Sequence, residues 1–176
     1  MWIASSLPYL SPRGADQADA WSQEAADAGR VGTQKIREVG EKVPPAQVSE
    51  ALGLPEGAAA VVRRRTILLD GRPVEQADSW YPAGIAAGTA LARPGKIKGG
   101  AVTLLADLGY TVHEAREEIE VRAATAEEST ELALPEGAPV IVLWRTSLTA
   151  EGVPFEVSVM VMAPQDRRLR YRLIAG

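Results

Sequence analysis

The chain of 176 residues contains no cysteine and only one histidine, His113. Without cysteine, disulfide scaffolds, thiolate metal sites and cysteine nucleophiles are excluded. A serine triad or a histidine-based metal site would have to use His113 alone, so we predict no metal site. No catalytic residue and no cofactor are predicted either. His113 is in phase with one face of a predicted strand, where a semi-buried histidine is the simpler interpretation.

An excess of positive charge and long apolar runs are also missing. The net charge is −4, so the chain lacks the basic surface needed to bind nucleic acid phosphates, and we do not expect it to bind DNA alone. No stretch approaches the roughly 20 apolar residues of a membrane-spanning helix, and the amino terminus does not have the pattern of a signal peptide. No membrane partner is expected, and a cytoplasmic location follows by default.

An internal repeat is the most informative feature that is present. Residues 52–66, LGLPEGAAAVVRRRT, recur as residues 132–146, LALPEGAPVIVLWRT. After one inserted residue, DGRPVE at 70–75 aligns with EGVPFE at 151–156. Each copy is typical of a short helix, a strand, a turn and a return strand. Two copies predict one domain with pseudo-symmetric halves and a site between them.

The other elements follow from periodicity and turn residues. Residues 1–14 have two prolines and no period, which predicts an arm or linker, and residues 15–176 are predicted to form a single domain. Because strands joined by hairpins are antiparallel, the predicted fold class is α+β, a central antiparallel sheet with helices packed on it. Predicted helices cover 16–28, 44–52, 101–108 and a segment that begins with a capping box at 125–128; predicted strands cover 33–43, 58–62, 73–81, 110–123, 140–143, 154–162 and 169–174.

Three consecutive arginines, Arg63, Arg64 and Arg65, stand out in the first copy. Because side chains alternate along a strand, Arg63 and Arg65 point to one face and Arg64 to the other. Two guanidinium groups on one face could bind a carboxylate or phosphate through paired hydrogen bonds. The alternative is an edge strand that carries solvated charges.

Arg145 is the repeat partner of Arg65 and lies in an otherwise apolar run. A guanidinium group is costly to bury alone, so Arg145 either has a counter-charge or lines an aqueous pocket. Glu75 and Glu156 are the predicted partners of Arg65 and Arg145, because each lies on the return strand of the same hairpin, near cross-strand reach. A structural ion pair and a ligand-binding site both fit this pattern.

The blocks of this sequence, in their order, resemble one known family. They are PPxxVxxxLGLPEG, VVRRR, DGxPV, ADSWYP, GTAL, EEIEVR and GVPFEV, spread from about Trp21 to the end of the chain. Their order and spacing resemble the UTRA domain, the effector-sensing domain of the HutC subfamily of GntR transcription regulators. The doubled helix and hairpin unit is consistent with this resemblance.

The resemblance implies a chorismate-lyase-like fold, in which a six-stranded antiparallel sheet and its covering loops hold a small-molecule effector, usually in a homodimer. It also implies that DNA is bound only through an amino-terminal winged helix-turn-helix domain, which we expect to be absent from this chain because no recognition helix precedes Trp21. The predicted function is ligand sensing and dimerisation in a transcription regulator, and not catalysis.

The resemblance also bears on single residues. It implies a pocket that uses an arginine at the position of Arg65 and is closed by a tyrosine of the last strand, here Tyr171; a core aromatic is the alternative for this tyrosine. Ser79 is a candidate hydrogen-bond donor, although an exposed strand serine fits equally well. The predicted effector-binding residues are Arg63, Arg65, Glu75, Ser79, Arg145, Glu156 and Tyr171.

Two positions depart from the members of the family that sense sugar phosphates. Those members typically have a second arginine and a glutamate where this chain has Ile67 and Ala77. A phosphosugar effector is therefore not expected, and a more apolar ligand with one anionic or polar end fits better.

Two other functions are compatible with the pattern. A lyase resembling chorismate lyase would anchor a substrate carboxylate on Arg65 or Arg145 and use Glu156 for acid and base chemistry. The repeated LPEG blocks resemble the sensor family and not the enzyme. A pure dimerisation module would have its concave face filled by its own side chains.

Overall fold

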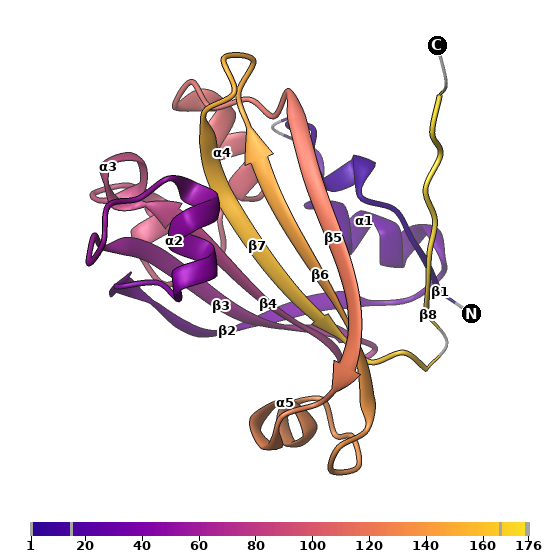
Figure 1. The fold of residues 1–176 in the computed structure, drawn as a ribbon. Helices are drawn as coiled ribbons and strands as arrows, with labels where there is room; N and C mark the ends of the chain where they lie inside the picture. The colour runs from indigo at the N-terminus through magenta and orange to yellow at the C-terminus, as the bar shows by residue number, and fades with distance from the viewer. Residues whose placement is uncertain (1, 15, 166, 175–176) are drawn as a thin grey trace.

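One six-stranded antiparallel sheet forms the centre of the computed structural model, which describes residues 2–14, 16–165 and 167–174 (Figure 1). The strand order is β2-β3-β4-β7-β6-β5, and every neighbouring pair is antiparallel. This arrangement confirms the predicted α+β class and the six-stranded sheet. The strands are β2 (Gly32–Lys42), β3 (Ala60–Leu69), β4 (Arg72–Pro82), β5 (Glu114–Ala123), β6 (Pro139–Leu148) and β7 (Pro154–Met162).

The sheet consists of two equivalent halves that meet between β4 and β7. In each half a short helix connects the first two strands: α2 (Ala46–Leu52) joins β2 to β3, and α5 (Ala126–Glu131) joins β5 to β6. Asp78 pairs with Val159 across the junction. These two residues are 81 positions apart, the same separation as Glu75 and Glu156 in the repeat, so the pseudo-twofold axis passes through this pair.

A β-bulge recurs at the same place in both halves. The register of β3 with β4 shifts between Ile67 and Leu68, and the register of β6 with β7 shifts between Ser147 and Leu148. In each case the return strand contains the extra residue, Val74 in β4 and Phe155 in β7. A bulge adds local twist and redirects side chains, so the equivalent bulges keep the two hairpins alike in shape.

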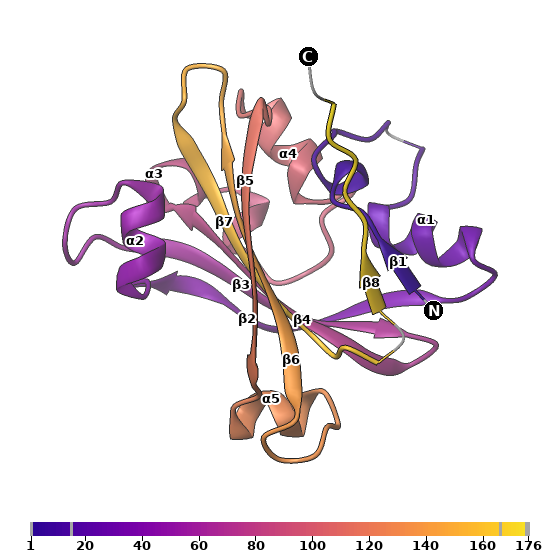
Figure 2. The same ribbon diagram turned by 45° about the vertical axis from the view of Figure 1, so that its right-hand side comes forward.

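Helices cover both faces of the sheet. Helices α2 and α5 pack on one face, which we call the outer face, through apolar side chains that include Val48, Leu52 and Leu132. Helix α1 (Ala20–Asp27) packs on the opposite, inner face, where Trp21 donates a hydrogen bond to the carbonyl oxygen of Leu68 at 3.1 Å. Figure 2 shows α1 and α2 on opposite sides of the sheet.

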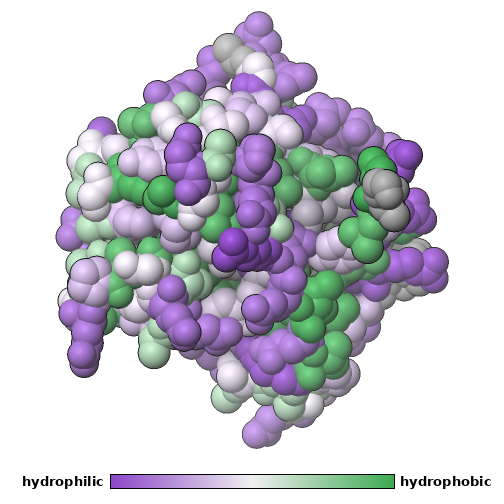
Figure 3. Space-filling model, turned by 45° about the horizontal axis from the view of Figure 1, so that its top comes forward, coloured by the Kyte–Doolittle hydropathy of each residue, from purple (hydrophilic) through white to green (hydrophobic). Residues whose placement is uncertain are grey.

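Apolar side chains also reach the molecular surface. Figure 3 shows hydrophobic areas in green between hydrophilic areas in purple on one face of the molecule. Ile119 and Val121, on the edge strand β5, are 48% and 69% exposed. None of the helices in the described part of the chain has the length and apolarity that crossing a lipid bilayer requires.

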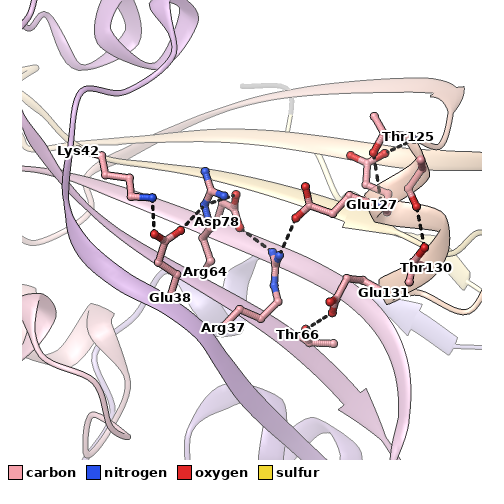
Figure 4. Close-up of polar contacts among 12 residues, drawn as sticks. Arg37, Glu38, Lys42, Arg64, Thr66, Asp78, Thr125, Glu127, Thr130 and Glu131 are labelled. Carbon is pink, nitrogen blue, oxygen red and sulfur yellow. Dashed lines mark hydrogen bonds and ion pairs between the residues drawn. The ribbon is translucent and has the colours of Figure 1, made fainter.

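A charged network on the outer face ties α5 to the first half of the sheet (Figure 4). Arg37 of β2 contacts Asp78 of β4 at 3.1 Å and Glu127 of α5 at 3.3 Å. Arg64 of β3 faces the same side and contacts Asp78 at 3.4 Å. Arg64 therefore lies on the opposite face from Arg63 and Arg65, as strand alternation predicts.

The two ends of the described chain lie side by side on the inner side of the sheet (Figures 1 and 2). Strand β1 (Trp2–Ala4) pairs in parallel with β8 (Arg167–Leu169), and the 3-10 helix η1 (Leu7–Tyr9) follows β1. Residues 2–14, within the predicted arm or linker, thus contact the domain. The prediction of a final strand over 169–174 was wrong, because β8 pairs with β1 through Arg167 to Leu169 and residues 170–174 are in no strand.

Some element boundaries differ from the prediction for local reasons. Helix α1 begins at Ala20 and not at residue 16, because the side chain of Asp19 caps it by accepting from the backbone N–H of Ser22. The predicted strand 110–123 begins only at Glu114, since Tyr110 packs on Phe155 with 5.8 Å between the rings. Helix α4 covers Ala101–Asp107, and the short elements α3 (Ala83–Ala86) and η2 (Ala90–Ala92) were not predicted.

The repeat predicts a stabilising substitution at Ala133. Gly53 follows α2 with φ +64°, and its repeat partner Ala133 follows α5 with φ +52°, a left-handed conformation that costs alanine about 1 kcal/mol. A133G is expected to raise the free energy of unfolding by about that amount, and the matched control G53A to lower it similarly, as measured by urea denaturation. A destabilising A133G would contradict this account.

Candidate functional site

A cavity of about 170 Å³ lies between the inner face of the sheet and the segments that cover it. Strands β3, β4, β6 and β7 form its floor, and the covering segments are α1, residues 2–13, the start of α4 and the carboxyl-terminal segment after β7. Cavities of comparable volume accept a single benzene-sized molecule.

Six of the seven predicted site residues line this one cavity: Arg65, Glu75, Ser79, Arg145, Glu156 and Tyr171. The first five lie on alternate positions of β3, β4, β6 and β7, so their side chains share the inner face. Tyr171 lines the rim of the cavity and is 47% exposed. It lies beyond β8 in irregular structure, and not in a strand as predicted.

The rest of the sheet surface in the cavity is apolar. Ile67 and Ala77, the two positions that differ from the phosphosugar pattern, are both buried and both line the cavity. They are joined by Leu143, Met160 and Met162. A ligand here would therefore contact thioether and aliphatic groups over much of its surface, with polar groups at one side.

Arg145 is neutralised by a carboxylate of the neighbouring strand. Its Nε lies 2.6 Å from Glu117 of β5, its directly paired residue, and its Nη2 donates to the Ser6 hydroxyl at 2.8 Å. Burial would raise the pKa of Glu117, but the hydrogen bonds from Ser6 and Arg145 and the guanidinium charge outweigh it and hold that pKa below its ordinary value. Arg145 is thus part of a structural ion pair at the cavity wall.

The predicted ion pairs within each hairpin were wrong in their partners. Glu75 pairs with Arg167 of β8 at 2.8 Å and not with Arg65. Arg145 pairs with Glu117 and not with Glu156. The registers explain this, because Glu75 is directly opposite Ile67, and Glu156 is directly opposite Ser147.

Arg65 differs from Arg145 in its surroundings. Its directly paired residue on β2 is Ile36, which occupies the position that Glu117 occupies in the second half. The Arg65 Nη2 donates to Ser79 at 2.9 Å, and the Ser79 hydroxyl lies 2.9 Å from that of Ser158. The buried Arg65 Nε has no hydrogen-bond partner within the described part of the chain. Among the residues that the structure describes, no carboxylate lies within ion-pair distance of Arg65.

Comparison with known families identifies this architecture. A sequence model of the UTRA domain matches residues 27–166, which is most of the chain. The chain belongs to the UTRA domain family. An uncharacterised HTH-type transcriptional regulator of Streptomyces coelicolor is 36% identical over 121 residues, which make up 67% of this chain and 45% of that protein. The chain spans less than half the length of the curated relatives it matches.

Solved structures place the same fold in transcription regulators. The ligand-binding domain of a GntR-family regulator from Bordetella bronchiseptica is 25% identical, with a TM-score of 0.74 over 81% of this chain and 91% of that one. Another GntR-family regulator superposes with a TM-score of 0.82 over 99% of this chain and 70% of that chain, at 24% identity. The relatives and solved structures named here are transcription regulators and not enzymes, and this UTRA domain shares the fold of the ligand-binding domain of the Bordetella regulator.

Arg63 has a different place in the UTRA domain from the other predicted residues. It is 4% exposed, and its guanidinium donates to the backbone carbonyl oxygens of Ala90, Leu91, Arg93 and Gly95 at 2.7–3.2 Å. It lines a second, adjoining cavity of about 270 Å³ that also contacts Arg65. Arg63 therefore anchors the loop between η2 and α4, which covers the sheet.

Sequence reasoning missed the residues that cover the cavity. Trp2, Ser6 and Tyr9 come from the amino-terminal segment, and the Tyr9 hydroxyl donates to Glu24 of α1, whose pKa is raised by burial. Nothing in the periodicity of residues 1–14 signals these contacts. Glu117 could have been found, because the strand alternation of the EEIEVR block places it on the inner face.

The ion pair of Glu117 with Arg145 predicts a pH-dependent stability. The pKa of Glu117 in the folded state lies below its ordinary value of 4.5, so this stabilisation is present above that value and is lost as the pH falls through the lowered pKa. E117Q should cost about 2 kcal/mol at pH 7 and flatten the loss of stability between pH 5 and pH 3, measured by urea denaturation. E118Q, at an exposed neighbour, is the control; equal effects of the two substitutions would contradict the assignment.

Proposed function

We propose that this UTRA domain senses a small amphipathic anion in the 170 Å³ cavity and, as in the HutC subfamily, controls a winged helix-turn-helix domain outside this sequence. The anionic end of the effector binds Arg65, with Ser79 beside it. Its apolar part contacts Ile67, Ala77 and the methionines of β7. The protein acts in the cytoplasm, where such a regulator meets its DNA.

The broken equivalence between Arg65 and Arg145 is the observation that supports this proposal most directly. The two arginines occupy the same position in the repeat, but only Arg145 has a carboxylate opposite it. Ile36 stands where that carboxylate would be for Arg65. A guanidinium in a cavity without a counter-charge is unfavourable, and an anionic ligand would supply the missing charge.

Residues 2–14 support the link to a DNA-binding domain. This segment precedes the core of the domain, covers the cavity and bonds to its wall through Ser6 and Arg145. An effector that binds one arrangement of this segment more tightly than another would shift the equilibrium between them. A domain attached before residue 1 would then change position.

Substitution of Arg65 tests the proposed function. We expect R65M to raise the dissociation constant of a carboxylate effector roughly 10- to 100-fold, because a charge-assisted hydrogen bond of about 1.5–3 kcal/mol is lost. Small carboxylates with apolar groups would be screened by the change in melting temperature, and hits measured by calorimetry. R64M, on the outer face of the same strand, is the matched control and should bind normally.

Two results would contradict the proposal. One is a screen in which no small carboxylate raises the melting temperature of the wild-type protein. The other is a hit whose affinity falls equally in R65M and R64M while both variants keep the circular dichroism spectrum of the wild type.

A homodimer completes the proposed function. Strand β5 ends the sheet, and Ile119 and Val121 expose apolar surface on it between charged residues, which is unusual for an unprotected edge. We expect light scattering after size exclusion to give twice the mass of 18.7 kDa and I119K/V121K to give the monomer mass. A wild-type monomer at about 100 μM, well above the usual range of regulator dimer affinities, would contradict this part.

A further inference from the structure

The six-stranded sheet places four charged side chains in the cavity, and they fall into two classes. Glu75 and Arg145 are neutralised, by Arg167 at 2.8 Å and by Glu117 at 2.6 Å. Arg65 and Glu156 have no ion-pair partner among the residues that the structure describes. The unpaired charges of the cavity floor are therefore one cation and one anion.

These two charges lie at the same end of the cavity. Ser79 of β4 and Ser158 of β7 are directly paired, and their hydroxyls are 2.9 Å apart. Arg65 bonds to Ser79, and Glu156 lies two residues before Ser158 on the same face of β7. The two hydroxyls thus lie between the guanidinium and the carboxylate.

Tyr81 provides a second marker of this proximity. Its side chain is fully buried and lines the cavity next to Ser79. Burial raises the pKa of Tyr81, the Glu156 carboxylate raises it further, and the Arg65 guanidinium lowers it. The Tyr81 hydroxyl is therefore close enough to interact electrostatically with both Glu156 and Arg65.

The two charges do not neutralise each other, because no nitrogen of Arg65 lies within 4.0 Å of a Glu156 oxygen. An anion alone would satisfy Arg65 but would leave Glu156 uncompensated and repelled by the new charge. A dianionic phosphate would increase that repulsion. A ligand that has a cation close to its anion satisfies both side chains at once.

We propose that the effector of this domain is an amino acid with a small apolar side chain. Its carboxylate binds Arg65, its ammonium group binds Glu156, and its side chain contacts Met160, Met162 and Leu143. The cavity of about 170 Å³ limits the ligand to roughly the size of the aliphatic amino acids. This inference rests on the proposed function and adds the ammonium group and its partner.

Matched ligands separate the contribution of each charge. Calorimetry compares four amino acids with the carboxylates that lack only their amino group. The pairs are L-valine with 3-methylbutanoate, L-leucine with 4-methylpentanoate, L-isoleucine with 3-methylpentanoate, and L-methionine with 4-(methylsulfanyl)butanoate. 3-Methylbutylamine, which is leucine without its carboxylate, completes the set. For the wild-type protein we expect at least one amino acid to bind tenfold or more tightly than its deaminated analogue, and the amine not to bind.

Variants assign the effect to named residues. In E156Q the preference for the amino acid should fall to about onefold, with the affinity for the deaminated analogue unchanged or improved. In R65M both ligands should weaken together. E118Q, on the exposed side of β5, is the control for E156Q, and unchanged melting temperatures without ligand establish that the variants are folded.

The outcomes distinguish this inference from the proposed function. If the deaminated acids bind as tightly as the amino acids and depend on Arg65, the ammonium site is refuted and the anion sensor stands. A preference for amino acids that survives in E156Q also refutes the assignment of Glu156. If no ligand of either class binds, the inference fails, and the wider carboxylate screen decides the proposed function.

Discussion

The antiparallel register between β4 and β7 determines the rest of the site. It pairs Ser79 with Ser158 at the junction of the two halves and directs the alternate residues of both strands toward α1. A shift of one residue would turn Glu156 and the methionines to the outer face and bring Val157 and Val159 into the cavity. The equivalent bulges at Val74 and Phe155 are consistent with this register, since they give β4 and β7 the same local twist before the two strands pair.

The two halves of the sheet are equivalent in backbone, but their equivalent side chains differ in their surroundings. A duplicated hairpin supplies two equivalent arginines on one face, and in the second half Glu117 neutralises its arginine. In the first half Ile36 is opposite Arg65, whose side-chain hydrogen bonds to the described residues go to the neutral groups of Gln34 and Ser79. The structural ion pair and the proposed anion site therefore have the same residue type at their centre and differ in the residue on the neighbouring strand. The repeat alone does not contain that information.

Much of the fold could be predicted from the sequence, because repeats, turn residues and the alternation of side chains along strands can be read from the sequence itself. The LPEG blocks and the hairpin turns located four of the six sheet strands, β3, β4, β6 and β7, and strand alternation brought five of the seven candidate residues to one cavity. The ion-pair partners were not predicted, because Arg167 lies on the distant strand β8, and the pairing of Glu117 with Arg145 depends on the register of β5 with β6. Arg63 was indistinguishable from Arg65 until the loop carbonyls that surround it were placed.

In the proposed function, the amino-terminal segment that covers the cavity links ligand binding to regulation. Ser6 bonds to Arg145, whose other contact is Glu117, so the amino-terminal segment is held by the wall of the cavity and not by the apolar core alone. Tyr9 adds a second polar contact through Glu24 of α1. In the proposed function, a ligand that contacts the same wall would change the strength of these polar contacts. A difference in affinity of about one to three kcal/mol between two arrangements of the segment, the usual size of an allosteric coupling, would shift the equilibrium between them.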